Sequence, residues 1–196
     1  NSKTAGLFIL SYPIINILFE RGAFLSNDTF YTSQVLSIFA LGLPAYILIK
    51  VLVTCFFARE DTKTPLYISI ISVIINVVLS LLLIGSMREM GIALATAISA
   101  WVNALLLFLI LYFKKNLILD NQLFMRSFKI IISVIIMVIA CYFLNNFLFS
   151  NILDLNTFIK ILILLIIIGG SKIIYLAMIF MLKVLTIDDL KRYMRK

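Results

Sequence analysis

Residues 66–85 read LYISIISVIINVVLSLLLIG, an apolar stretch of twenty positions without a charged side chain. A helix of this length rises about 30 Å at 1.5 Å per residue, which matches the hydrocarbon core of a bilayer. The stretch therefore predicts a helix that crosses a membrane, and a crossing helix of this kind decides the fold class.

The rest of the chain has the same character. Hydrophobic residues make up 63% of the 196 positions, charged residues only 13%, and the mean hydropathy is +1.15. A soluble domain is roughly 45–50% apolar, so this chain has too few polar side chains to cover a soluble particle. Six apolar segments alternate with polar loops: Ala5–Phe19, Val35–Ala58, Leu66–Gly85, Gly91–Phe113, Ile130–Phe149 and Phe158–Leu182. We expect an all-α, polytopic transmembrane helix bundle, whose short first segment, carrying Pro13, is the far end of a helix that starts upstream.

The basic residues predict the orientation of the spans. Alternate loops hold eleven and three Lys and Arg residues, and the richer set should be cytoplasmic by the positive-inside rule. The richer set is Arg59, Lys63, Lys114, Lys115, Arg126, Lys129, Lys183, Lys191, Arg192, Arg195 and Lys196, and the poorer set is Arg21, Arg88 and Lys160. We expect a multi-pass protein of the cytoplasmic (inner) membrane with a cytoplasmic C-terminus. The formal charge of +8 is explained by these membrane-flanking clusters, so we expect no nucleic-acid partner.

Residues for catalysis or cofactor binding are scarce. The chain has no His, its two cysteines, Cys55 and Cys141, lie far apart inside apolar segments, and its nine carboxylates lie in loops or at span ends. A metal cluster, a disulfide framework or a nucleophile and base pair cannot be assembled from these residues. We expect a non-enzyme without a cofactor or metal.

Lys50 and Lys172 are the informative charges, because a charge within the hydrocarbon costs several kcal/mol unless it is paired, hydrated or able to reach the interface. They lie about 12 Å and 15 Å from the cytoplasmic ends of their spans. Each lysine either extends to the headgroups or serves a buried path for an anionic substrate.

Two polar stripes and two pairs of helix breakers accompany these lysines. Ser69, Ser72, Asn76 and Ser80 follow one face of the third segment, and Gly91, Ala95, Ser99 and Asn103 recur every four residues in the fourth. The stripes fit either close helix packing or a hydrated cavity, in which Asn76 and Asn103 would join Lys50 and Lys172 on a substrate path. Gly42 with Pro44, and Gly169 with Gly170, predict helix breaks that bend a path or are simple packing kinks.

Three groups of motifs resemble the MurJ (MviN) lipid II flippase family. They are PII at 13–15 with LFERGAF at 18–24; GLP at 42–44 with KVL at 50–52, FAR at 57–59 and DTKTP at 61–65; and GIALAT at 91–96 with WVN at 101–103. Their order resembles the ninth to the twelfth helices of that family. The last two spans match its thirteenth and fourteenth helices mainly in length and position.

The resemblance implies a fold, a substrate and a set of loops. It implies half of a multidrug/oligosaccharidyl-lipid/polysaccharide exporter-type fold, in which fourteen helices form two lobes around a cationic cavity and the last pair forms a groove for a lipid tail. The substrate would be lipid II, the undecaprenyl-pyrophosphate-linked peptidoglycan precursor, moved by alternating access. The partners would be membrane lipids and an N-terminal half that this sequence lacks. Glu20, Arg21 and Gly22 would form a periplasmic loop motif, and Arg59, Asp61 and Lys63 a cytoplasmic gate loop.

The resulting expectation for the domains has four parts. Residues 1–113 form part of the second transport lobe, 114–129 a cytoplasmic loop, 130–182 two peripheral helices with the lipid-tail groove, and 183–196 a basic cytoplasmic tail. A related exporter of polysaccharide lipids or small molecules, and a membrane scaffold module that transports nothing, are the alternative functions.

Overall fold

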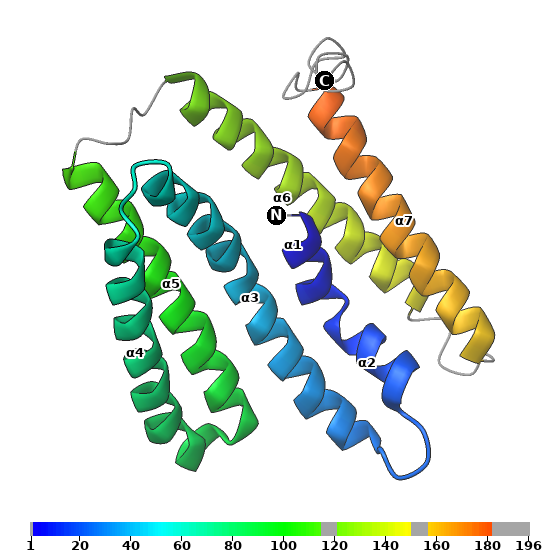
Figure 1. Ribbon diagram of the computed structural model, residues 1–196. Helices are drawn as coiled ribbons and strands as arrows, with labels where there is room; N and C mark the ends of the chain where they lie inside the picture. Colours follow the sequence, from blue (N-terminus) through cyan, green and yellow to red (C-terminus); the bar gives the residue numbers. More distant parts are fainter. Residues whose placement is uncertain (1, 115–120, 150–156, 182–196) are drawn as a thin grey trace. The chain divides into compact units, whose positions relative to one another are not determined.

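The computed structural model describes residues 2–114, 121–149 and 157–181, and every regular element in these ranges is an α-helix. The helices are α1 (Ser2–Ile9), α2 (Ser11–Phe19), α3 (Ser26–Phe57), α4 (Lys63–Met87), α5 (Glu89–Phe113), α6 (Asn121–Phe149) and α7 (Thr157–Met181), as Figure 1 shows. The stretches Ser26–Phe57, Lys63–Met87, Glu89–Phe113 and Ile161–Met178 are long and apolar enough to cross a membrane. The predicted all-α, polytopic helix bundle is confirmed.

The chain divides into two compact units. Phe19–Ile118 form one, here called the three-helix unit because it holds α3, α4 and α5. Asn1–Leu18 and Leu119–Lys196 form the other, here called the four-helix unit because it holds the described helices α1, α2, α6 and α7. The first helices thus group with the last pair, whereas the sequence places them with residues up to 113. Helix α6 also begins at Asn121, inside the segment 114–129 that the sequence assigns to a loop, and the predicted tail 183–196 lies outside the described residues.

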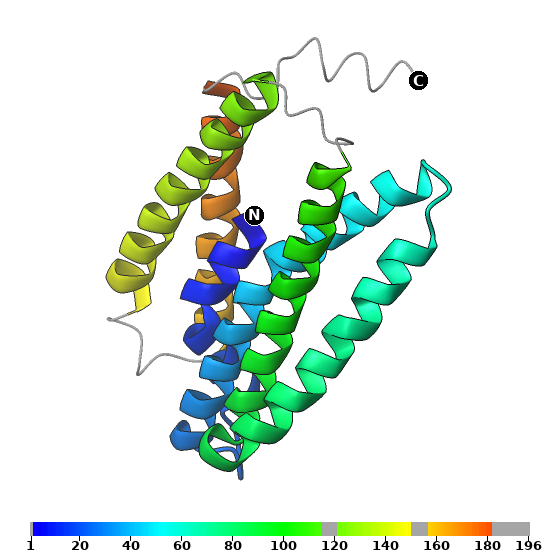
Figure 2. The ribbon, with the colours of Figure 1, turned by 90° about the vertical axis from the view of Figure 1, so that its left-hand side faces the viewer.

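Helix α5 is the centre of the three-helix unit, since it packs against both α3 and α4 while those two helices meet only slightly (Figures 1 and 2). Small residues on α5 allow this close approach. A Cβ atom built on Gly42 of α3 would lie 3.3 Å from the Cα atom of Ala97, and Ala45 packs with Ala100 and Ala104. Further along the same direction, Leu52 and Phe56 of α3 join Leu107 and Leu111 of α5 in a buried cluster. The order of these contacts shows that α3 and α5 run parallel.

The hairpin between α4 and α5 is tight. Arg88 is the one residue between the two helices, and its φ of 49° lies in the left-handed region. Two residues further on, Gly91 lies so close to α4 that a Cβ atom there would be 2.7 Å from the carbonyl oxygen of Leu83. Backbone atoms cannot move aside as a flexible side chain does, so this hairpin requires glycine at position 91.

The two polar stripes lie largely within this packing. Gly91, Ala95 and Ser99 of α5 are buried, as is Ser72 of α4, while many of the large apolar side chains of α4 are exposed. The hydroxyl of Ser72 donates to the carbonyl of Ile68 at 2.9 Å, which satisfies it within its own helix. These residues therefore serve close helix contact, the first of the two interpretations that the sequence leaves open.

In the four-helix unit, α6 and α7 lie side by side in opposite directions, and α1 packs against both (Figures 1 and 2). Their contact buries Cys141 of α6 with Leu164 and Ile167 of α7 and Leu10 and Ile17 from the start of the chain. The buried hydroxyls of Ser133 and Ser171 donate to the carbonyls of Lys129 and Ile167, four residues earlier in each helix. These two buried hydroxyls are thereby satisfied within their own helices.

A real break separates α1 from α2 at Leu10. Pro13 has no N–H to donate to the carbonyl of Ile9, although the bonds from Leu10 N to Gly6 O and from Ile14 N to Leu10 O, both 2.9 Å, carry the chain across the break. The predicted helix breaks at Gly42 with Pro44 and at Gly169 with Gly170 are wrong, because α3 and α7 are continuous through them. Hydrocarbon offers the backbone no water to bond, so a helix is favoured even across glycine or a single proline.

We predict that Gly91→Ala destabilises the three-helix unit by about 1–3 kcal/mol, the usual cost of forcing extra atoms into a packed contact. Gly85→Ala is the matched control, because a Cβ atom at Gly85, also in this hairpin, meets nothing within 4 Å. The control should be neutral or slightly stabilising, since alanine favours a helix over glycine. Thermal unfolding in detergent, followed by loss of helical circular dichroism, measures both, and equal stability of the two variants would contradict the hairpin geometry.

Candidate functional site

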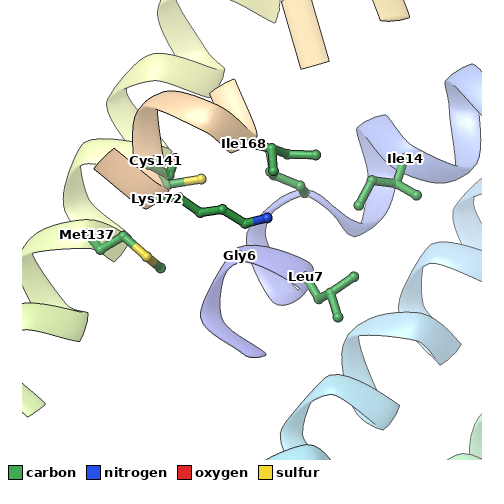
Figure 3. A pocket seen from close by; sticks show the side chains of 9 residues that line it. Gly6, Leu7, Ile14, Met137, Cys141, Ile168 and Lys172 are labelled. Carbon is green, nitrogen blue, oxygen red and sulfur yellow. The ribbon is translucent and has the colours of Figure 1, made fainter. Parts of the chain in front are cut away.

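A cavity of about 250 Å³ lies inside the four-helix unit, between α1, α2, α6 and α7 (Figure 3). It is lined by Gly6, Leu7, Leu10, Ile14, Met137, Cys141, Ile168, Ser171 and Lys172. The helical spacing of four residues puts Met137 and Cys141 on one face of α6, and Ile168 and Lys172 on one face of α7. Apolar side chains therefore form most of the wall, and Lys172 supplies its one charge.

Lys172 extends from α7 across this cavity toward α1 (Figure 3). Nine residues separate it from the end of the described helix at Met181, so it lies about 13 Å from that end. Its side chain is exposed, and no ion pair joins it to a carboxylate in the described parts of the chain. An ammonium group without a protein anion, beside an apolar hollow, can bind an anionic group whose attached chain lies on the apolar wall.

Two glycines, Gly169 and Gly170, precede Lys172 in α7. A Cβ atom at either Gly169 or Gly170 would meet nothing within 4 Å, so neither glycine is needed for close helix contact. The two residues predicted as a helix break therefore lie within a continuous helix.

The other residues of the predicted substrate path do not gather around Lys172. Lys50, Asn76 and Asn103 lie on α3, α4 and α5, all in the three-helix unit. Lys50 is exposed on the side of α3 turned away from α5, since Ala45, Leu52 and Phe56 occupy the facing side.

The two asparagines are half-buried. The Oδ1 atom of Asn76 accepts a hydrogen bond from Ser80 at 3.2 Å, whereas the buried Oδ1 atom of Asn103 has no partner among the described residues. Asn103 thus keeps an unused acceptor inside the three-helix unit.

The predicted gate loop is tied to the end of α5. The ammonium group of Lys114 lies 2.8 Å from Oδ2 of Asp61, and it also stands 6.0 Å above the ring centre of Phe56. Thr64 donates to the same carboxylate through its N–H at 3.1 Å and its hydroxyl at 2.8 Å, which anchors the start of α4. Hydrogen bonds from Lys114 and Thr64 lower the pKa of Asp61 to about 2. Asp61 therefore joins the ends of three helices.

The loop motif at Glu20, Arg21 and Gly22 is also ordered. Thr29, at the start of α3 and fully buried, donates to Oε2 of Glu20 at 2.7 Å. Gly22 adopts a φ of 61°, which glycine tolerates without strain, and the N–H of Leu25 donates to Asp28 at 3.0 Å. These bonds fix the turn between α2 and α3.

Comparison with known protein families decides the wider assignment. A family model described as "Lipid II flippase MurJ" matches residues 2–164. The chain belongs to the MurJ lipid II flippase family. Proteins named "Probable lipid II flippase MurJ" are similar to it: that of Rickettsia prowazekii is 52% identical over 105 residues, 54% of this chain and 21% of the relative. That of Rhizobium tropici is 45% identical over 131 residues, 67% of this chain and 25% of the relative.

A third relative, from Rhizobium meliloti, is 44% identical over 133 residues, 68% of this chain and 25% of the relative. The chain thus spans about a quarter of the length of these MurJ relatives or less. Together with the apolar helices, membership of the MurJ family identifies a multi-pass membrane protein.

Sequence reasoning missed two features of this chain. Lys114 was counted only as a cytoplasmic charge, and nothing in the sequence indicates that it pairs with Asp61, which lies 53 residues earlier. Cys141 is buried, as its place inside an apolar segment suggests, but it also lines the cavity with Met137, which the sequence does not indicate. The apolar periodicity of α6 could have identified the face, although not the cavity, because the cavity depends on α1.

We predict that the contacts of Asp61 contribute fully to the stability of the chain when the pH is above 3.8, the ordinary pKa of this carboxyl group. This contribution should be lost as the pH falls through about 2, the pKa of Asp61 in the folded chain. The sign follows because the folded state holds the carboxylate ionised, so acid must protonate it before the contacts fail. Unfolding in detergent at a series of pH values measures the difference between the chain and its Asp61→Asn variant. The difference should shrink between about pH 4 and pH 2, and a difference that is constant over that range would contradict the assignment.

Proposed function

We propose that the chain is the C-terminal portion of a flippase that moves lipid II across the bacterial cytoplasmic membrane by alternating access. The observation that carries the proposal is the apolar cavity between α1, α2, α6 and α7 with the ammonium group of Lys172 extending across it. The names of the MurJ relatives point to the same substrate.

The chemistry of the substrate matches such a site. Undecaprenyl pyrophosphate has a long apolar chain and an anionic pyrophosphate, so a protein that carries it needs an apolar surface next to a cation. In the cavity, Leu7, Ile14 and Ile168 offer the apolar surface and Lys172 the cation. In this assignment α6 and α7 form the groove for the lipid tail, and Lys172 meets the phosphates as they pass.

The remaining predicted path residues have a separate role in this proposal. Lys50, Asn76 and Asn103 belong to the three-helix unit, where they would contact the sugar-peptide head within a cavity completed by helices that this sequence lacks. Asn103 is suited to this because its Oδ1 atom has no partner in the described part of the chain. Arg59, Asp61 and Lys63 would form the cytoplasmic gate loop, and Glu20, Arg21 and Gly22 the periplasmic turn.

We predict that Lys172→Met weakens transport roughly tenfold or more, because a hydrogen bond to a charged group contributes about 1.5–3 kcal/mol. Lys172→Arg should retain most activity, since it keeps the charge. Lys160→Met, at the beginning of the same helix α7, is the control and should have little effect. The test uses a chimera, which is a relative's flippase in which this chain replaces the matching segment. The chimera is expressed in cells depleted of their own flippase, and the translocation of lipid II is measured.

The outcomes separate the alternatives. Equal losses from Lys172→Met and Lys160→Met would remove the case for Lys172 in the path. A well-expressed chimera that exports a polysaccharide lipid or a small molecule instead of lipid II would favour the related-exporter function. Complementation that survives the loss of Lys50 and Lys172 together would favour a scaffold role.

We further predict the orientation of the helices. In a variant without Cys55 and Cys141, a cysteine at Arg88 should react with a membrane-impermeant maleimide in intact cells whose outer membrane has been opened. A cysteine at Lys63 should react only after the inner membrane is permeabilised, because its loop belongs to the basic, cytoplasmic set. Both positions are exposed, so access to the reagent depends on the membrane side alone. The reverse labelling pattern would overturn the proposed orientation.

A further inference from the structure

We infer that Trp101 is a positioning residue that gives α3 a hydrogen bond next to the one missing at Pro44 and thereby sets the direction of α3 toward Lys50. Trp101 is the only tryptophan of the chain. Its indole N–H donates to the backbone carbonyl of Leu41 at 3.1 Å, a bond from α5 to α3. Backbone carbonyls inside a helix normally accept from the N–H four residues later, so an acceptor that also serves another helix needs an explanation.

Pro44 supplies that explanation. It lies within α3 and has no N–H, so the carbonyl of Ala40 loses its helical donor, and the proline ring pushes that carbonyl outward. Leu41 follows Ala40 in the same turn of α3, and its carbonyl accepts a hydrogen bond from outside the helix. Trp101 is the donor, so α5 supplies a hydrogen bond to the turn of α3 in which Pro44 leaves Ala40 without its helical donor.

The surrounding contacts place this bond where α3 and α5 pack through small residues. Gly42 lies against Ala97, and Ala45, with no exposed surface, packs with Ala100 and Ala104. The contact next to the indole bond has no bulky side chains, so side-chain packing there does little to limit the sliding of α3 along α5 or the bending of α3. An oriented hydrogen bond restricts both motions, which small apolar residues alone do not.

The hydrogen bond from Trp101 to Leu41, here called the brace, has a consequence for the position of Lys50. Lys50 follows Pro44 by six residues, about 9 Å along α3, on the side away from α5. A bend at Pro44 would swing this part of α3 and move the ammonium group. With the bond to Trp101 in place, α3 and α5 move as one body, as lobe rotation in alternating access requires. Only this consequence rests on the proposed function, whereas the brace itself does not.

The test is a double-mutant cycle of Trp101→Phe and Pro44→Ala in the 196-residue chain. Phenylalanine keeps an aromatic ring but removes the N–H, and alanine at 44 returns the helical donor to Ala40. Trp101→Phe should raise the unfolding equilibrium constant roughly threefold, which is the average effect of losing one hydrogen bond between membrane helices. In the Pro44→Ala chain it should have almost no effect. Tyr112→Phe, an exposed aromatic on the same helix, is the control and should be silent in both.

Equal effects of Trp101→Phe in the two backgrounds would overturn the brace, because the indole would then contribute only apolar packing. An absence of effect in both would overturn it as well. The positioning of Lys50 has its own readout: Lys50→Cys, in a chain without Cys55 and Cys141, is labelled by a water-soluble maleimide. Trp101→Phe should change the labelling rate severalfold, and Pro44→Ala should cancel that change. An unchanged rate would overturn the positioning role, and because no substrate is present, it would leave the proposed transport function untouched.

Discussion

The structure depends on one constraint, which is that backbone N–H and C=O groups in hydrocarbon must find partners within the protein. Helices satisfy them locally, so the described elements are helices and even Pro44, Gly169 and Gly170 fail to interrupt α3 and α7. Where proline does disturb the ladder, the chain compensates. Trp101 donates to a carbonyl beside Pro44, and at Pro13 the bonds on either side of Leu10 carry the chain from α1 to α2.

Helix association follows from the same environment. Lipid tails are as apolar as leucine, so packing depends on close contact and on polar groups that satisfy one another. In the three-helix unit, Gly42, Gly91 and the alanines of α5 provide that contact. In the four-helix unit, larger side chains pack less completely and leave the cavity in which Lys172 stands. The three-helix unit thus packs through small residues, whereas the four-helix unit encloses a hollow.

Much of this could be predicted from the sequence, because span length and charge act locally. The helices α3, α4, α5 and α7 follow from their apolar runs, and the family follows from motifs such as those at 61–65 and 91–96. The start of α6 was missed because a helix continues beyond the apolar run into polar residues near Arg126. Contacts such as Asp61 with Lys114, and the meeting of Gly6 with Met137 around one cavity, join distant parts of the chain and leave no periodic signal.

The central claim is that the cavity beside Lys172 holds the substrate, and photocrosslinking tests it most directly. A photoreactive amino acid is placed at Ile168, which lines the cavity, or at Leu165, which is exposed on the same helix. After illumination with radiolabelled lipid II in a membrane of ordinary phospholipids, capture should occur at position 168, exceed that at 165, and fall when unlabelled lipid II is added. Equal capture at both positions, unaffected by unlabelled lipid II, would contradict the account.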